Sequence, residues 1–217
     1  MQNDDETSAS GAPLSSVSPE PVAAAPTRKR PKPGERRVQI LQALAAMLEQ
    51  PGSERITTAA LAARLEVSEA ALYRHFASKA QMFEGLIEFI EQSVFTLINQ
   101  IAEREPAGQS QAGRIVAMLI QFAEKNPGMT RVMVGDALVH ENERLQQRMN
   151  LFFDKVESSL KQSLRDGGEG SATPSADAQV RASLLTAFIV GRLQRFARSG
   201  FKRPPSEHLD ACLSRML

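Results

Sequence analysis

The sequence predicts an all-α fold for everything after Gly34, and three observations support this prediction. Apolar residues recur at spacings of three and four, as they do on the buried face of an amphipathic helix. No run of alternating or β-branched residues is strong enough to indicate a strand. Helix-capping residues, prolines and glycines separate the periodic segments, so the sequence also indicates where the helices begin and end.

The first predicted helices follow from these signals in order. Apolar positions from Ile40 to Leu48 form a helix that ends at the turn "QPGS". Thr57 caps a second helix, and Ser68 caps a third that extends from about Glu69 to His75. Ser78 and Gln81 form a capping-box pattern at the start of a helix of about seven turns. We expect later helices at about 111–124, 129–139, 141–165 and 176–199, and a short last one after Pro205.

The composition of the whole chain limits its function. The 217 residues carry 26 Lys and Arg against 25 Asp and Glu, so affinity for a polyanion must come from where the basic residues lie. Cys212 is the only cysteine, which excludes an internal disulfide and a cysteine-rich zinc site and fits a reducing compartment. No apolar run reaches the roughly 20 residues of a membrane helix, and the acidic first residues do not resemble a secretory signal. We expect a cytoplasmic protein without a membrane span.

The segment 1–34 differs in composition from the rest of the chain. It is rich in Ser, Ala and Pro and poor in large apolar side chains, so burial would not offset the entropy lost on ordering. We therefore expect a disordered tail. The tail leads into the basic stretch "TRKRPKPGERR", in which Glu35 is the single acid. Taken alone, this stretch fits either a solvated basic run or an arm that contacts DNA.

Two short helices around a tight turn, between Thr57 and Phe76, match the helix-turn-helix pattern, in which the second helix lies in the DNA major groove. The second helix opens with small residues, so its backbone can approach the groove; Ala70 suits a thymine methyl, and Thr58 and Ser68 suit phosphates or base edges. Donors that suit phosphates follow at its end. The predicted DNA-binding residues are Arg36, Thr57, Thr58, Ser68, Glu69, Ala70, Tyr73, Arg74, His75 and Lys79.

The stretch "ITTAALAARLEVSEAALYRHFASKAQMFEGLIEFIE" resembles the TetR family, whose "LYxHFxxK" ending is matched by Leu72, Tyr73, His75, Phe76 and Lys79. Within that family the chain is similar to nucleoid occlusion factors of the SlmA type, through "RITTAALAA", "VSEAALYRHF", "LIEFIE" and "EKNPGMTRVMVGDALV". The similarity covers about 36–201. It implies a helix-turn-helix DNA-binding domain over 35–80 and a helical dimerisation and regulatory domain over 81–217.

The resemblance also implies a function. It implies a homodimer that binds palindromic sites in double-stranded chromosomal DNA and, while bound, antagonises polymerisation of the tubulin-like division protein FtsZ. Such a protein is associated with the nucleoid and keeps the division septum away from it. The FtsZ-facing surface that the resemblance implies comprises Phe89, Leu97, Met118, Gln121, Lys125 and Asn126. Leu97, Gln121 and Lys125 depart from the arginine, glycine and arginine expected there, although Lys125 keeps the charge.

Apolar stripes on the last two long predicted helices are mostly core by default, and they are also where two copies of the chain would meet. One stripe lies within 145–164 and the other within 184–196, and both are wide. Ala187 and Gly191 are small enough to let a partner helix approach closely. A four-helix interface, with two helices from each subunit, uses such surfaces economically.

Two alternatives were weighed against this function. A TetR-type transcriptional repressor released by a small-molecule ligand would need convergent polar groups in an apolar cavity, for which the sequence offers His140, Asn126 and Gln121. An enzyme would need a catalytic pattern, and the sequence has no metal-spaced cluster, phosphate-cradling glycine loop or nucleophile elbow. We therefore predict no enzyme activity, no cofactor, no metal and no small-molecule ligand.

The basic stretch before the first helix generates a first prediction. If it lies along phosphates or enters a minor groove, deletion of Met1–Pro33 lowers DNA affinity severalfold at moderate salt, because several cationic contacts are lost. The circular dichroism spectrum and thermal midpoint stay unchanged. Anisotropy titrations with labelled duplex DNA measure the effect, and equal affinity of the truncated and full chains would show that the stretch is only a solvated linker.

Overall fold

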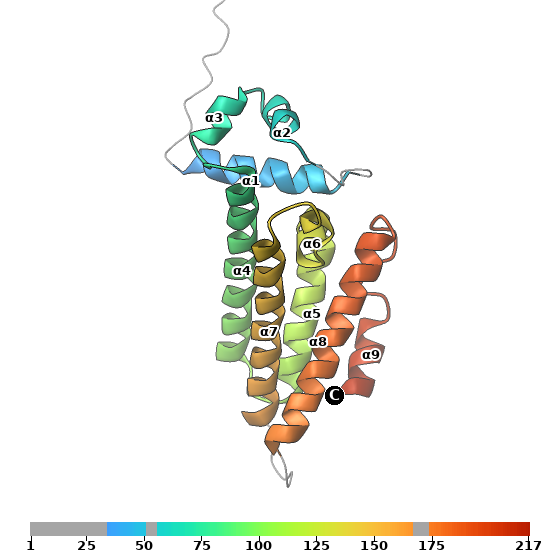
Figure 1. Ribbon diagram of the computed structural model, residues 1–217. Helices are drawn as coiled ribbons and strands as arrows, with labels where there is room; N and C mark the ends of the chain where they lie inside the picture. The colour runs from blue at the N-terminus through green and yellow to red at the C-terminus, as the bar shows by residue number, and fades with distance from the viewer. Residues whose placement is uncertain (1–33, 51–55, 167–173) are drawn as a thin grey trace, which may run out of the picture. The chain divides into compact units, whose positions relative to one another are not determined.

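The computed structural model describes residues 34–50, 56–166 and 174–217, and the tail predicted over 1–33 lies outside the described residues. Within them the fold is all-α, as predicted (Figure 1). The elements are α1 (Glu35–Leu48), α2 (Thr58–Arg64), α3 (Glu69–Tyr73), α4 (Lys79–Arg104), α5 (Gln109–Lys125), α6 (Pro127–Met133), the 3-10 helix η1 (Asp136–Leu138), α7 (Glu143–Asp166), α8 (Pro174–Arg198) and α9 (Leu209–Met216).

Three predicted helix starts are confirmed by their capping hydrogen bonds. The side chain of Thr57 accepts from the Ala60 amide at 3.1 Å. The side chain of Ser68 accepts from the Ala71 amide at 3.2 Å. Ser78 accepts from the amide of Gln81, whose own side chain accepts from the Ala77 amide. Each cap satisfies an amide that the first turn of a helix leaves without a partner, and such a cap contributes about 1 kcal/mol.

The prediction of a helix over 129–139 is wrong at both ends. Helix α6 begins earlier because Pro127 occupies its first turn, where the missing amide costs nothing. It ends at Met133 because Gly135 adopts a left-handed conformation with φ of 84°, after which the chain forms the short η1. The third predicted helix is also shorter than expected, since α3 ends at Tyr73 and Arg74 is its C-cap.

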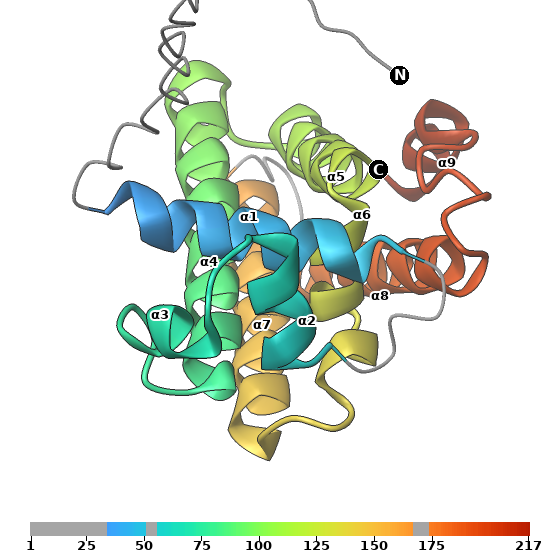
Figure 2. The same cartoon turned by 90° about the horizontal axis from the view of Figure 1, so that it is seen from above.

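The core lies between α4, α5, α7 and α8, which extend side by side in both views (Figures 1 and 2). Ile90, Val94, Val116 and Ile120 are fully buried there, and Phe152 packs edge-on against Phe95 with ring centroids 5.6 Å apart. Full burial of each such side chain contributes about 1.5–3 kcal/mol. The stripe predicted on 145–164 is confirmed as core, because its members Leu145, Met149, Phe152, Val156, Leu160 and Leu164 are buried.

Helix α1 lies across the end of this bundle and touches α6 (Figure 2). Gly128 of α6 approaches the backbone of Ala45 so closely that a Cβ at position 128 would lie 2.0 Å from the Ala45 carbonyl oxygen. One turn further along α6, Arg131 Nη1 donates to the carbonyl of Leu48 at 3.3 Å. Only a glycine at position 128 permits this contact between α1 and α6, and the contact attaches α1 to the bundle.

Charged pairs join α4 to α7 and to the connection that precedes α7. Glu84 pairs with Arg144, and Glu91 pairs with Arg148 at 2.6 Å. The side-chain hydrogen bond to Glu91 raises the pKa of Arg148 above its usual value, so the arginine stays charged in the folded protein. Nearer the start of α4, Lys79 pairs with Glu141. These contacts fix the relative positions of the two helices along their length.

The Gly128 contact generates a second prediction. Gly128→Ala lowers the free energy of unfolding by about 1–3 kcal/mol or more, because the added methyl forces two backbone segments apart. Gly113→Ala is the matched control, since its Cβ would meet only the movable side-chain end of Leu217 at 3.2 Å, and alanine favours the helix. Urea unfolding of both variants measures the difference, and equal stability would contradict the proposed role of Gly128.

Candidate nucleic-acid interface and partner surface

Helix α3 buries one side and exposes the other. Leu72 and Phe76 are each 1% exposed and anchor α3 and the turn after it to the core. The opposite side presents Ser68, Glu69, Ala70, Tyr73 and Arg74, all of which are exposed. These five residues are among those predicted to bind DNA, so the fold brings them to one face of a short helix. A helix with one free polar face is the form that enters a major groove.

A short polar network crosses from α3 to α2. The hydroxyl of Thr58 donates to the carboxylate of Glu69, and Tyr73 OH lies 3.5 Å from the same hydroxyl. Tyr73 is 45% exposed, so its hydroxyl is still accessible to a ligand. The network links the exposed polar side chains of the two helices.

The start of α1 is tied to the end of α3. Arg37 Nη1 donates to the carbonyl of His75, and the same guanidinium lies 4.1 Å from the ring centroid of Phe76. Arg36, which was predicted to bind DNA, is partly exposed and donates to Gln39 at 2.9 Å. Arg37 could not be recognised as an anchor from the sequence, because its partners lie 38 and 39 positions away and no local pattern connects them.

Lys79 is less accessible than the predicted DNA-binding residues on the open side of α3. Its side chain is 27% exposed and pairs with Glu141, whose side chain is 11% exposed. Its ammonium also lies 5.7 Å from the ring centroid of Phe83. Glu141 was missed by the sequence analysis, since nothing in the sequence relates a residue before α7 to the first residue of α4.

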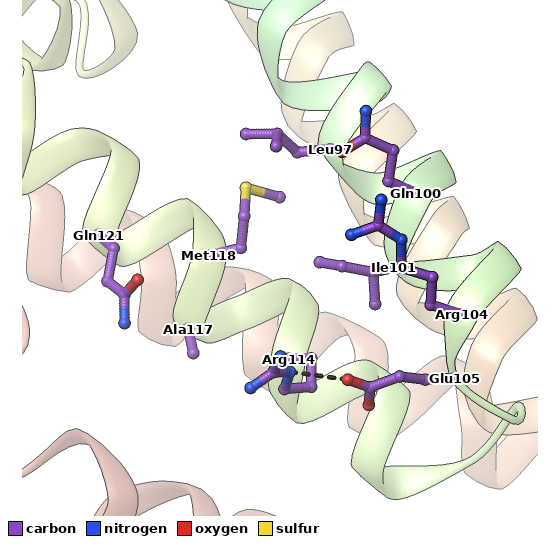
Figure 3. Close-up of a pocket in the computed structure, with 9 residues that line it drawn as sticks. All are labelled: Leu97, Gln100, Ile101, Arg104, Glu105, Arg114, Ala117, Met118 and Gln121. Carbon is purple, nitrogen blue, oxygen red and sulfur yellow. Dashed lines mark ion pairs between the residues drawn. The ribbon is translucent and has the colours of Figure 1, made fainter.

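The predicted partner surface coincides in part with a cleft between α4 and α5 of about 270 Å³ (Figure 3). Leu97 and Met118 point toward each other across it, and Gln121 lies at one end (Figure 3). The other end carries the ion pair between Arg114 and Glu105, at 2.8 Å. The cleft therefore has an apolar middle and polar ends.

The other three predicted partner residues lie outside this cleft. Phe89 is 44% exposed and lies about two turns before Leu97 on α4. Lys125 is exposed at the last position of α5. Asn126 is the C-cap of α5, and its side chain donates to the Phe122 carbonyl at 2.7 Å. The surface thus extends along α4 and α5 beyond the cleft.

Comparison with known proteins decides the family. Residues 40–86 match the bacterial regulatory proteins of the tetR family, and residues 110–216 match the SlmA-like, tetracyclin repressor-like C-terminal domain. The chain is 53% identical over 177 residues to the nucleoid occlusion factor SlmA of Idiomarina loihiensis, covering 81% of this chain and 90% of that protein. The chain belongs to the SlmA nucleoid occlusion factors of the TetR family.

Further relatives and solved structures agree with this family. The SlmA of Photobacterium profundum is 50% identical over 182 residues, covering 82% of this chain and 92% of that protein. The fatty acid degradation regulator FadR from Bacillus halodurans has the same fold, with a TM-score of 0.70 at 14% identity, over 86% of this chain and 97% of that one. A regulator from Rhodococcus sp. gives a TM-score of 0.66 at 21% identity, over 83% and 92% of the two chains.

Membership of the TetR family confirms two sequence predictions. The fold is TetR-like, and the family consists of regulators rather than enzymes. Within the described ranges, no group of three or more His, Cys, Asp or Glu could hold a metal ion. Every described helix is also too short or too polar to cross a bilayer.

Helices α7 and α8 each carry exposed apolar side chains. Leu151 is 57% exposed, and Val180 and Leu184 are each 60% exposed. Leu184 was predicted within an apolar stripe, whereas Leu185, Ile189 and Leu193 of the same stripe are fully buried. Val180 was not predicted. Helical periodicity alone cannot separate these faces when a helix is apolar on more than one side. The face in the core and a face that a second copy would cover give the same sequence pattern.

Tyr73 generates a third prediction for this TetR-family interface. Tyr73→Phe weakens binding to duplex DNA about tenfold or more, because a hydrogen bond to a charged phosphate is lost. The slope of log affinity against log salt stays the same, because no charge is removed. Anisotropy titrations over a range of salt concentrations measure both. The thermal midpoint stays unchanged, since the hydroxyl is exposed; a lowered midpoint or an unaltered affinity would contradict a DNA-contacting role.

Proposed function

We propose that this chain binds palindromic chromosomal DNA as a homodimer and, when bound, antagonises FtsZ polymerisation, which blocks septum formation over the nucleoid. The observation that carries this proposal is the identity of 50–53% over about nine tenths of the length of relatives named nucleoid occlusion factor SlmA. A protein with this role works in the cytoplasm in association with the nucleoid. It requires three surfaces: one for DNA, one for a second copy and one for FtsZ.

The exposed face of α3 supports the DNA-binding part of the proposal. Ala70 at its tip is small, so the helix can approach base edges closely. Tyr73 and Arg74 at its end carry donors that suit the phosphates on either side of a groove. The buried side chains of Leu72 and Phe76 hold this helix rigidly. The face therefore combines a close backbone approach with donors that set its position on the duplex.

The exposed apolar residues of α7 and α8 support the dimer. Leu151, Val180 and Leu184 would each bury a large apolar side chain against a second copy. Gly191 lies two turns beyond Leu184, and open space surrounds the position of its missing Cβ, so a partner helix can come close. A two-fold dimer presents two α3 helices in symmetric positions, which matches the symmetry of a palindromic site.

The cleft between α4 and α5 supports the FtsZ-binding part. Leu97 and Met118 offer an apolar contact, and Gln121 offers a polar one at one end of the cleft. Lys125 adds an exposed charge one turn further along α5, outside the cleft. Helix α4 begins directly after the turn that follows α3, and it also carries Leu97. A shift at the DNA-binding face can therefore be carried to the cleft by one rigid helix. Coupling of this kind typically contributes about 1–3 kcal/mol, which tightens FtsZ binding roughly 5- to 150-fold.

A repressor released by a small ligand is the alternative to this function. Its ligand would occupy an apolar cavity among the middle helices. In the described part of the chain, Val94, Val116, Ile120 and Phe152 are fully buried and fill the space between α4, α5 and α7. The regulator FadR from Bacillus subtilis, whose structure contains stearoyl-CoA, is only 15% identical in sequence to this chain. That similarity shows a shared fold and not a shared ligand. We therefore favour the DNA-bound regulator of FtsZ.

The proposed function is tested by sedimentation of FtsZ polymers. The full chain is mixed with FtsZ and GTP, with and without genomic DNA fragments that the chain has selected. We expect less FtsZ in the pellet when selected DNA is present, and little change with the protein alone. No effect of DNA on the pelleted fraction would contradict the proposal.

Lys125 generates a fourth prediction. Lys125→Glu abolishes the DNA-dependent loss of pelleted FtsZ, because it reverses an exposed charge at the end of the partner surface. Affinity for selected DNA stays within about twofold, since Lys125 lies at the end of α5 and not on α3, and salt screens interactions between separated exposed charges.

The matched control for this prediction is Lys125→Arg, which keeps the charge and should keep the antagonism. If Lys125→Glu loses DNA binding, or if it antagonises FtsZ as well as the parent protein does, the proposed separation of the two surfaces is wrong.

A further inference from the structure

The first residue of α4 directs its charge inward. The Lys79 ammonium pairs with Glu141, a carboxylate that is only 11% exposed, and it lies 5.7 Å from the centroid of the Phe83 ring. Phe83 itself is 1% exposed and belongs to the core. The exposed donors of this region, Tyr73 and Arg74, are placed differently, because they lie on the open side of α3. In this arrangement Lys79 faces the interior and not the surface proposed to bind DNA.

A DNA phosphate and the Glu141 carboxylate are alternative partners for Lys79. Both are anions, so a phosphate that approaches Lys79 is repelled by Glu141 until the carboxylate withdraws. An acidic side chain this far buried is stable when it is paired, and the ammonium supplies that pairing. A phosphate that takes the ammonium therefore leaves Glu141 without its charged partner and favours movement of Glu141 into water.

We propose that Glu141 competes with DNA for Lys79, so that the connection between η1 and α7 is closed onto the start of α4 in the DNA-free protein and released when DNA binds. The inference rests on the proposed function, because it requires DNA to bind at the face of α3. It adds an autoinhibitory contact to that function. Closure of the connection and DNA binding are thermodynamically linked. Closure weakens DNA binding by some factor, and bound DNA shifts the equilibrium toward the open connection by the same factor.

The released segment is short. Leu138 is fully buried, so the segment is anchored on its η1 side, and the hydrogen bond from the Glu141 amide to the Leu138 carbonyl is the one that breaks when the segment opens. The pairs Glu84–Arg144 and Glu91–Arg148 hold α7 to α4 beyond it. Between these anchors lie Val139 and His140, which are exposed. Opening is thus confined to 139–142, and α7 stays in place.

The test compares Glu141→Gln with Glu91→Gln in the full chain. Both substitutions remove one negative charge and one ion pair that α4 makes, with the connection before α7 or with α7 itself, and both keep the size of the side chain. Position 91 lies about 18 Å further along α4, at 1.5 Å per residue, so it is screened from the DNA face at 0.1 M salt. Affinity is measured by anisotropy for a selected genomic duplex and for a random duplex of the same length, between about 50 and 200 mM salt.

We expect Glu141→Gln to tighten binding to both duplexes and to steepen the slope of log affinity against log salt by up to about one, as for one gained phosphate contact. Over that fourfold range of salt, this corresponds to an additional change in affinity of up to about 3.5-fold. Glu91→Gln should match the parent protein. In a Lys79→Ala background, Glu141→Gln should have no effect, because the cation for which the two anions compete is absent.

Several outcomes would overturn the proposal. An equal effect of Glu141→Gln and Glu91→Gln would show that only net charge matters. A gain from Glu141→Gln that persists without Lys79 would show that Glu141 acts on DNA directly. Absence of salt-dependent DNA binding by the parent protein would instead contradict the proposed function itself.

A second measurement needs no variant and applies even if Glu141→Gln does not fold. Amide hydrogen exchange of the parent protein is followed with and without the selected duplex. We expect exchange at 139–142 to become faster on DNA while exchange in α7 stays the same. Unchanged or slower exchange at 139–142 on DNA would overturn the proposed release.

Discussion

The contact between Gly128 and the backbone of Ala45 is the constraint on which the rest of the structure depends. Helix α1 can lie against α6 only because position 128 has no side chain, since a Cβ there would be 2.0 Å from a carbonyl oxygen. Arg131 adds a hydrogen bond to the carbonyl of Leu48 at the end of α1. At the other end of α1, Arg37 holds the carbonyl of His75. The bundle thus positions α3 through α1, by contacts at both ends of that helix.

Helix α4 connects the three proposed activities of the molecule. Its first residue, Lys79, follows the DNA-facing helix, and Leu97 in its second half lines the partner cleft. Its acidic residues Glu84 and Glu91 pair with α7, which carries the exposed Leu151. One rigid helix therefore touches the DNA face, the cleft and the helix next to the proposed dimer surface. Signals between these surfaces need no cavity in the core, which is filled by side chains.

Much of the fold was predictable because the signals that specify it are local. Caps at Thr57, Ser68 and Ser78 require only a residue three positions away, and all three form as predicted. The core stripe of α7 follows from helical periodicity, which the sequence displays directly. The break between α6 and η1 was missed because a helical pattern of apolar residues continues past Gly135, and only its left-handed conformation interrupts the helix. Which predicted interface residues are accessible could not be predicted at all.

The sequence by itself determined the all-α class, the three capped helix starts, the helix-turn-helix and the family, because periodicity, capping and motif spacing act over a few residues. Only the tertiary structure decided that Arg37 anchors α3, that Lys79 pairs with Glu141, and that Val180 and Leu184 remain exposed. These facts depend on residues that are 38 or 62 positions apart in the chain, or on which face of a helix the bundle covers. A local sequence pattern does not show which distant residues come into contact, because the packing of whole helices sets those contacts.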